Sequence, residues 1–220
     1  IHAGGYAALP FGEGPPALVD AAVRYLRLMD RPSFAQQAVS DWRAALETNL
    51  VALLASVAPS HEDSRVIFSN SGTEAIEVAL KLARAYRPGA GTFLAFSHGY
   101  HGKTLGALSV TPTEEYQRAF RPLVPGVKVL PYGDAEAVER EIFADGPDRI
   151  AGIVLEPVQG EGGVVVPPPG FLAEIERIRV RHGVPVIADE IQSGLGRTGH
   201  WFASVAGGLD PDVITLAKPL

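Results

Sequence analysis

Lys218 follows a nearly continuous apolar run, residues 213–217, and its amine is the most reactive group that the sequence places at a strand end. Such a run is typical of a strand buried on both faces of a parallel sheet. A lysine after that strand lies at the carboxyl edge of the sheet, where α/β proteins bind ligands. Partial removal from water lowers the proton affinity of an amine, which favours Schiff-base formation. By itself the pattern is more often that of a lysine that begins a solvated loop, so the rest of the chain must decide.

The segment 69–74 reads Ser-Asn-Ser-Gly-Thr-Glu and lies between a predicted strand and a predicted helix. Ser71 and Glu74 fit a capping box, which alone would account for both residues. The same turn offers free backbone N–H groups, hydroxyls and Gly72 at the positive end of a helix, a combination typical of phosphate sites. Because the lysine of a nucleotide P-loop is missing, a small phosphorylated cofactor fits better than ATP. Both interpretations stay open at this point.

Tyr100 and His101 follow the predicted strand 92–96 in a glycine-rich loop. An aromatic ring just beyond a strand suits stacking on a flat ligand, although a half-buried loop ring is the alternative. His98 and His101 are three residues apart, but no third ligand accompanies them, so we expect no metal site.

A carboxylate follows each of two later predicted strands, 150–155 and 184–188. Glu156 follows strand 150–155 and either binds a cation or proton or only accepts hydrogen bonds from loop amides. Asp189 follows strand 184–188, where a buried charge is costly without a positive partner. A protonated ring nitrogen of a cofactor would be one such partner, and a nearby arginine or lysine the other.

The segment 194–199 matches the dinucleotide fingerprint G-x-G-x-x-G. Its glycines begin several residues after the strand, and residues 200–208 lack the apolar periodicity of a helix. The structural context of the fingerprint is therefore missing, and we interpret the match as fortuitous.

From residue 65 onward, short apolar runs alternate with helical segments, which is the signature of βαβ units. The predicted strands are 66–68, 92–96, 127–130, 150–155, 184–188 and 213–217, and the predicted helices between them are 73–86, 113–121, 135–143 and 170–182. An irregular arm, 1–16, and two helices, 17–29 and 34–57, precede them. We expect an α/β fold with a doubly wound, mostly parallel sheet. At its carboxyl edge we expect a phosphate-binding turn, an aromatic ring, two acids and a lysine. Pyridoxal 5′-phosphate is a cofactor that uses all of these groups.

Composition excludes several classes of partner. The 220 residues carry a formal net charge of −6, which gives no basic footprint for nucleic acid. The absence of cysteine excludes disulfides and thiolate chemistry and is compatible with a reducing cytoplasm, the location that we expect. The longest apolar run is too short to span a bilayer, so we expect no membrane partner.

Six motifs together resemble those of the class III pyridoxal-phosphate aminotransferases: 70–75, 100–104, 156–163, 189–192, 196–199 and 216–218. The resemblance runs from about residue 34 to the end and implies fold type I and a homodimer. It also implies a role for each residue of the predicted site: phosphate binding for Ser71, Gly72 and Thr73; stacking on the ring for Tyr100, with His101 beside it; pairing with the ring nitrogen for Asp189; a place near the ring hydroxyl for Gln192; substrate contact for Glu161; and the Schiff base for Lys218.

The resemblance implies transamination, with Lys218 and Asp189 as the catalytic residues. A terminal amino group of an amino acid or diamine would pass to a keto acid such as 2-oxoglutarate, as in the ornithine, acetylornithine and putrescine branches. An aminomutase, racemase or decarboxylase on the same scaffold is the alternative, followed by a non-catalytic or dinucleotide-binding module.

We expect two domains: an N-terminal arm and helix over residues 1–33, and a cofactor-binding large domain over residues 34–220. The arm 1–18 matches the family poorly. Family members continue past Leu220, so we expect this chain to be an incomplete part of the large domain that is inactive by itself.

Overall fold

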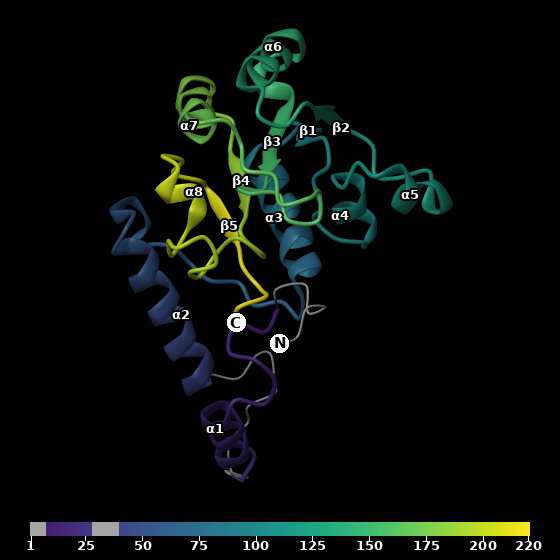
Figure 1. The fold of residues 1–220 in the computed structure, drawn as a ribbon. Coiled ribbons are helices and arrows are strands. Elements are labelled where there is room, and N and C mark those ends of the chain that lie inside the picture. The colour runs from purple at the N-terminus through teal and green to yellow at the C-terminus, as the bar shows by residue number, and fades with distance from the viewer. Residues whose placement is uncertain (1–7, 28–39) are drawn as a thin grey trace. The chain divides into compact units, whose positions relative to one another are not determined.

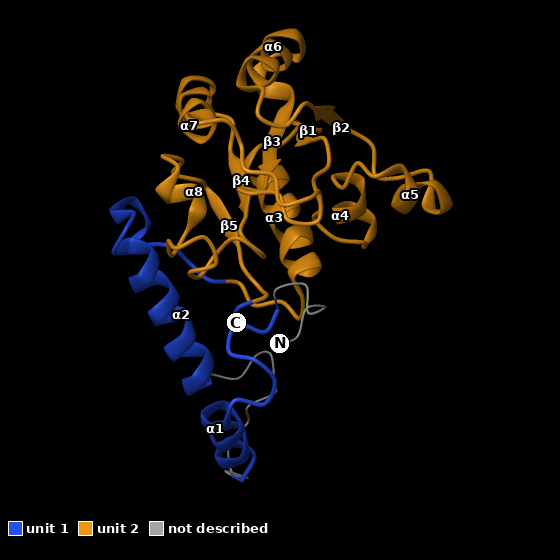
Figure 2. Cartoon of the chain, viewed as in Figure 1, with its two compact units in different colours: residues 1–66, 219 blue, residues 67–218, 220 orange. Residues whose placement is uncertain are grey.

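The computed structural model describes residues 8–27 and 40–220, and the chain divides into two compact units (Figure 2). One unit comprises residues 1–66 with Pro219, and the other comprises residues 67–218 with Leu220. The domain boundary expected between residues 33 and 34 lies outside the described residues and stays a prediction.

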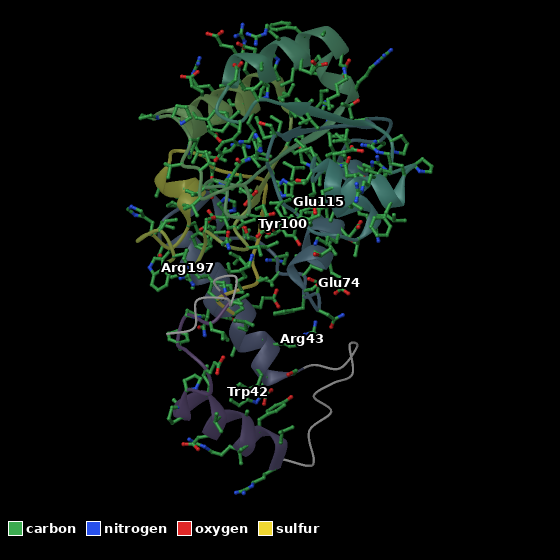
Figure 3. The ribbon with its side chains drawn as sticks, turned by 45° about the vertical axis from the view of Figure 1, so that its right-hand side comes forward. Trp42, Arg43, Glu74, Tyr100, Glu115 and Arg197 are labelled. Carbon is green, nitrogen blue, oxygen red and sulfur yellow. The ribbon has the colours of Figure 1, made fainter. Side chains whose placement is uncertain are left out.

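The first unit contains two α-helices and a short 3₁₀ helix: α1 (Pro16–Arg27), α2 (Asp41–Ala55) and η1 (Pro59–His61). Ser40 caps α2, since its side chain accepts a hydrogen bond from the backbone N–H of Arg43. The ring of Trp42 packs edge-on against Tyr25, with the two centroids 5.4 Å apart (Figure 3). Of the helix predicted over 34–57, the first residues lie outside the described part. Within that part, no helix combines the length and the apolar character needed to cross a bilayer.

The second unit is built on a sheet of five parallel strands in the order β2-β1-β3-β4-β5 (Figure 1). The strands are β1 (Thr92–Phe96), β2 (Val127–Leu130), β3 (Ile150–Leu155), β4 (Val186–Asp189) and β5 (Val213–Thr215). The predicted strand 66–68 is wrong, because these residues pair with no strand in the described part of the chain. Ile67 is 56% exposed, so this short run has no buried face to hold it against a sheet.

Helices cover both faces of this sheet. The helices of this unit are α3 (Gly72–Tyr86), α4 (Leu105–Ser109), α5 (Glu114–Gln117), η2 (Arg118–Phe120), α6 (Ala135–Asp145), η3 (Pro147–Arg149), α7 (Phe171–His182) and α8 (Ala203–Ala206), and those that pack on the sheet are α3, α4, α6 and α7. The short helices α4 and α8 were not predicted, because helices of five and four residues are too short to show helical periodicity.

Successive residues of β1 point to opposite faces and enter two separate cores. Leu94 and Phe96 pack with apolar residues of α6 and α7. Phe93 and Ala95 pack with apolar residues of α3 and α4. This two-sided burial confirms the doubly wound α/β architecture, and the parallel strands bring their carboxyl ends to one edge.

Candidate active site

A cavity of about 340 Å³ lies at the carboxyl edge of the sheet. Its walls are formed by Ser71, Gly72, Thr73, Tyr100, His101, Glu156, Glu161, Asp189, Ile191, Gln192, Ala217 and Lys218. All nine residues that the sequence predicts for a site are among them. Glu156 was considered but not assigned to the predicted site, whereas Ile191 and Ala217 were missed, although each directly precedes a predicted site residue in the chain.

The N-terminus of α3 forms one wall of the cavity. Ser71 is the N-cap, and its Oγ accepts the backbone N–H of Glu74 at 3.2 Å. The carboxylate of Glu74 accepts the backbone N–H of Asn70 at 2.6 Å, which is a capping box displaced by one residue. The capping interpretation is thus correct, and it does not compete with the cavity, because Ser71, Gly72 and Thr73 line it as well.

Gly72 lies where a larger residue would fill the site. A Cβ atom at this position would lie 2.9 Å from Ile191 Cδ1 and 3.2 Å from Ala217 Cβ. Gly102, with φ +130°, likewise lets its loop approach α3, since a Cβ there would lie 2.3 Å from Thr73 Oγ1. The two glycines keep the helix terminus open beside the loops that follow β1 and β4.

Tyr100 and His101 lie in the loop that follows β1. The Tyr100 ring packs edge-on against Tyr116, with centroids 6.0 Å apart and an interplanar angle of 78° (Figure 3 labels Tyr100). His101 is buried, and its backbone N–H donates to Thr111 Oγ1 at 2.9 Å. A ring and an imidazole from one loop therefore reach the cavity side by side.

His101 is the hydrogen-bonding partner of Asp189. Its Nδ1 donates to Asp189 Oδ2 at 2.7 Å, and both side chains are buried. Burial lowers the pKa of His101, but the hydrogen bond that it donates to Asp189 and the negative charges of Asp189 and Glu156 outweigh this effect, so the pKa is raised. The sequence predicts a nearby arginine or lysine as the protein's own partner of Asp189, whereas the structure has a histidine 88 positions away in the chain.

Asp189 is also held by its other oxygen. Its Oδ1 accepts the backbone N–H of Ile191 at 3.1 Å and the hydroxyl of Thr215 at 3.3 Å. These contacts fix the carboxylate at the junction of β4 and β5, with one edge facing the cavity.

Glu156 accepts two loop amides, as one of its two interpretations predicted. Its Oε1 accepts the N–H of Tyr100 at 2.9 Å, and its Oε2 accepts the N–H of Gly160 at 3.0 Å. Burial is the main cause that raises the pKa of Glu156; the charge of Asp189 adds to the rise, while His101 and the two amides oppose it.

Lys218 lies three residues beyond the end of β5, in the wall of the cavity. Its backbone N–H donates to the carbonyl of Ile191 at 3.3 Å, which joins the segment after β5 to the loop after β4. Gln192 projects from the same loop and packs very closely on Gly160, where a Cβ atom would lie 1.2 Å from Gln192 Oε1.

The glycine-rich segment 194–199 forms a turn and does not line the cavity. Leu195 N–H donates to Trp201 O at 2.7 Å and Gly196 N–H to His200 O at 3.1 Å, and the next helix, α8, begins only at Ala203. A dinucleotide fingerprint requires the glycines to open a helix directly, so the geometry agrees with a fortuitous match. Among the described residues, no group of three or more His, Asp or Glu side chains could hold a metal ion.

A family model described as aminotransferase class-III matches residues 2–220 of this sequence. The chain belongs to the class III aminotransferases. Solved structures of similar proteins agree with this assignment and with fold type I. An amine transaminase from an uncultivated Pseudomonas species, solved in its PLP-bound form, is 30% identical with a TM-score of 0.84, and the match covers 94% of this chain and 51% of that chain.

Two further solved structures are similar at the same level. An (S)-enantioselective omega-transaminase from Thermomicrobium roseum is 31% identical with a TM-score of 0.87, over 98% of this chain and 52% of the other. The ornithine aminotransferase from Toxoplasma gondii is 29% identical with a TM-score of 0.84, over 97% and 50%. The chain thus spans about half the length of these structures. Class III aminotransferases depend on pyridoxal 5′-phosphate, so the family confirms the cofactor expected from the sequence.

Proposed function

We propose that this chain forms the cofactor-binding part of a pyridoxal-phosphate-dependent aminotransferase. The observation that carries the proposal is the meeting of Lys218, Asp189 and the N-terminus of α3 in one cavity. An amine, a buried carboxylate and a set of helix N–H groups are the three kinds of group that a flat, phosphorylated aldehyde with a ring nitrogen needs.

The donor set of the cavity fits this cofactor. Backbone N–H groups at the start of α3, with the Thr73 hydroxyl, suit a phosphate, and the space that a Cβ on Gly72 would fill stays open. The Tyr100 ring suits one face of a pyridine. Gln192 offers an amide beside the ring hydroxyl. When bound, the cofactor supplies an electron sink for the carbanion formed at the substrate carbon.

Asp189 would hold a proton on the ring nitrogen of the cofactor. Its carboxylate is buried and rigidly held, and in a site of low dielectric an ionised carboxylate strongly favours a protonated neighbour. His101 contributes by holding Asp189 in place through Nδ1.

Lys218 has two tasks. Its amine is the nucleophile that would hold the cofactor through its aldehyde group. The same amine would serve as the general base that accepts the proton of the substrate carbon. Glu161, also in the cavity wall, contacts the substrate or a group that binds it.

The proposed reaction transfers a terminal amino group from an amino acid or diamine to a keto acid such as 2-oxoglutarate. The names of the similar proteins, amine transaminase, omega-transaminase and ornithine aminotransferase, support a donor of this kind. A homodimer, a cytoplasmic location and a large domain that begins at about residue 34 belong to the same proposal.

Borohydride reduction of the full-length protein, followed by peptide mapping, tests the proposal. We expect a pyridoxyl adduct at Lys218, which Lys218→Arg abolishes and which Lys81→Arg, an exposed lysine on α3, leaves intact. An unmodified Lys218 in the wild-type protein would refute it.

Substrate profiling with and without 2-oxoglutarate then separates transamination from aminomutase, racemase or decarboxylase chemistry. Product that forms without any amino acceptor would exclude the aminotransferase reaction.

A further inference from the structure

Glu156 lies at the carboxyl end of β3 and is only 6% exposed. Its two oxygens bind two different loops, because Tyr100 N–H donates to Oε1 and Gly160 N–H donates to Oε2. The two amides are 60 residues apart in the chain (100 and 160). A single carboxylate therefore connects the loop after β1 with the loop after β3.

Each of these loops places a side chain of the cavity. The first loop carries the Tyr100 ring. The second carries Gly160, against which Gln192 packs so closely that the position of the Gly160 backbone determines where the Gln192 amide can lie. A shift of either loop would move one wall of the cavity relative to the other.

We propose that Glu156 is a positioning residue for cofactor binding, which sets the spacing between Tyr100 and Gln192 by holding both loop amides. The inference rests on the proposed function, since it concerns the same cavity. A role as proton carrier is disfavoured, because both oxygens already accept hydrogen bonds from amides that cannot donate elsewhere without moving the loops.

The charge of Glu156 has a second effect on the site. The titratable groups around it are His101 from the loop after β1, Tyr132 from the segment after β2, Asp189 from β4, and Glu161 and Lys218 in the cavity wall. The negative charge of Glu156 supports the protonated form of His101. Replacing it by a neutral amide would therefore lower the pH at which cationic groups of the cavity lose their protons.

The loops have other connections that make a mild substitution informative. Tyr132 Oη donates to the backbone carbonyl of Glu156 at 2.8 Å, and Gln159 Nε2 donates to Ser97 O at 2.8 Å. These bonds do not use the Glu156 carboxylate. We therefore expect Glu156→Gln to fold, with the loops still attached but no longer held at both amides, because a glutamine side chain has one acceptor oxygen.

The experiment compares three variants of the full-length protein. In Glu156→Gln, we expect hydrogen exchange at the Tyr100 or Gly160 amide to become about tenfold faster without cofactor, and the Kd for pyridoxal phosphate to rise about tenfold. The near-UV circular dichroism of the bound cofactor should change, and the pH midpoint of its absorption should fall.

The variant Gly160→Ala separates the effect of the position of Gln192 from the effect of the charge of Glu156. It displaces Gln192 without removing a charge, so we expect weaker cofactor binding and altered dichroism with an unchanged pH midpoint. Asp212→Asn is the matched control: its carboxylate accepts the N–H of Val186 at 2.8 Å at the opposite edge of the sheet, and we expect no change in any of these signals.

Wild-type exchange rates in Glu156→Gln would overturn the inference, and so would faster exchange with unchanged Kd and dichroism. Absence of a Lys218 adduct in the wild-type protein would instead refute the proposed function, and the exchange rates would still show whether Glu156 holds the two loops.

Discussion

Asp189 and Glu190 are adjacent carboxylates at the end of the same strand, yet they serve two different regions of the molecule. Asp189 is 3% exposed, lines the cavity and is paired with the ionisable side chain of His101. Glu190 is 0% exposed and is absent from the cavity wall. Because successive side chains of an extended chain point to opposite sides, the two acids leave β4 in different directions.

The partners of Glu190 are all neutral. Its oxygens accept the hydroxyls of Ser193 and Ser204 and the backbone N–H groups of Ala203 and Ser204, at 2.6 to 3.0 Å. Glu190 therefore holds the start of α8 and the turn that precedes it. The comparison teaches that burial alone does not identify a functional acid: the partner's charge and access to a cavity do so.

The largest expected effect is on the Asp189 side. Asp189→Asn should reduce kcat/KM about 10³-fold while the protein stays folded, because the neutral amide no longer supports a proton on the cofactor ring. Steady-state kinetics together with thermal unfolding would measure both quantities. If Asp189→Asn lost much stability but kept normal turnover per folded molecule, Asp189 would have the structural role that we assign to Glu190.

Glu190→Gln should show the opposite pattern. An amide NH₂ group would face backbone N–H donors in a dry environment, so the free energy of unfolding should fall by about 2 to 3 kcal/mol. Turnover per folded molecule should stay within about twofold of wild type, because Glu190 does not reach the cavity. Urea denaturation and active-site titration provide the two measurements, and unchanged stability would contradict the structural role of Glu190.

The pairing of His101 with Asp189 makes the stability of the protein depend on pH. The pKa of His101 is raised above 6.5, because the hydrogen bond and charge of Asp189 outweigh the lowering by burial. The stability that this pair contributes is therefore fully present below pH 6.5 and is lost as the pH rises through the folded-state pKa. We expect the Tm of the cofactor-free protein to fall by a few degrees over that range.

His101→Gln should remove that part of the pH dependence. Glu156, whose pKa is also raised by burial, makes stability fall in the same direction, and His101 opposes that rise. The difference between wild type and variant therefore reports the histidine together with its coupling to Glu156. Parallel Tm curves for the two proteins above pH 6.5 would show that His101 is neutral in the folded state.

The smallest effect is expected far from both acids. Arg181 on α7 forms an ion pair with Glu139 on α6 at 2.9 Å, and its side chain is 64% exposed. Arg181→Ala should change the free energy of unfolding by less than about 1 kcal/mol and leave turnover unchanged, because exposed pairs gain little in water. A loss as large as that of Glu190→Gln would mean that charge pairing on the surface matters as much as the buried carboxylates.

Much of the fold followed from local pattern. The strands Thr92–Phe96, Val127–Leu130 and Ile150–Leu155 agree residue for residue with their predicted bounds, because their apolar runs are bounded by turn residues on both sides. The prediction of strand 66–68 was wrong because local sequence does not show whether a partner strand is available. A three-residue run becomes a strand only if such a partner accepts its backbone hydrogen bonds.

The sequence by itself determined that Tyr100, Asp189 and Lys218 reach the carboxyl edge, since every parallel strand ends there and each of these residues follows or ends such a strand. Ser71 reaches the same cavity as the N-cap of α3, although the strand predicted before it is absent. Only the tertiary structure decided what these groups contact: the pairing of Asp189 with His101, the two amides on Glu156, and the separation of Asp189 from Glu190. The physical reason is that strand formation depends on neighbours within a few residues, whereas the protonation and orientation of a buried side chain depend on groups that are distant in the chain and adjacent in space.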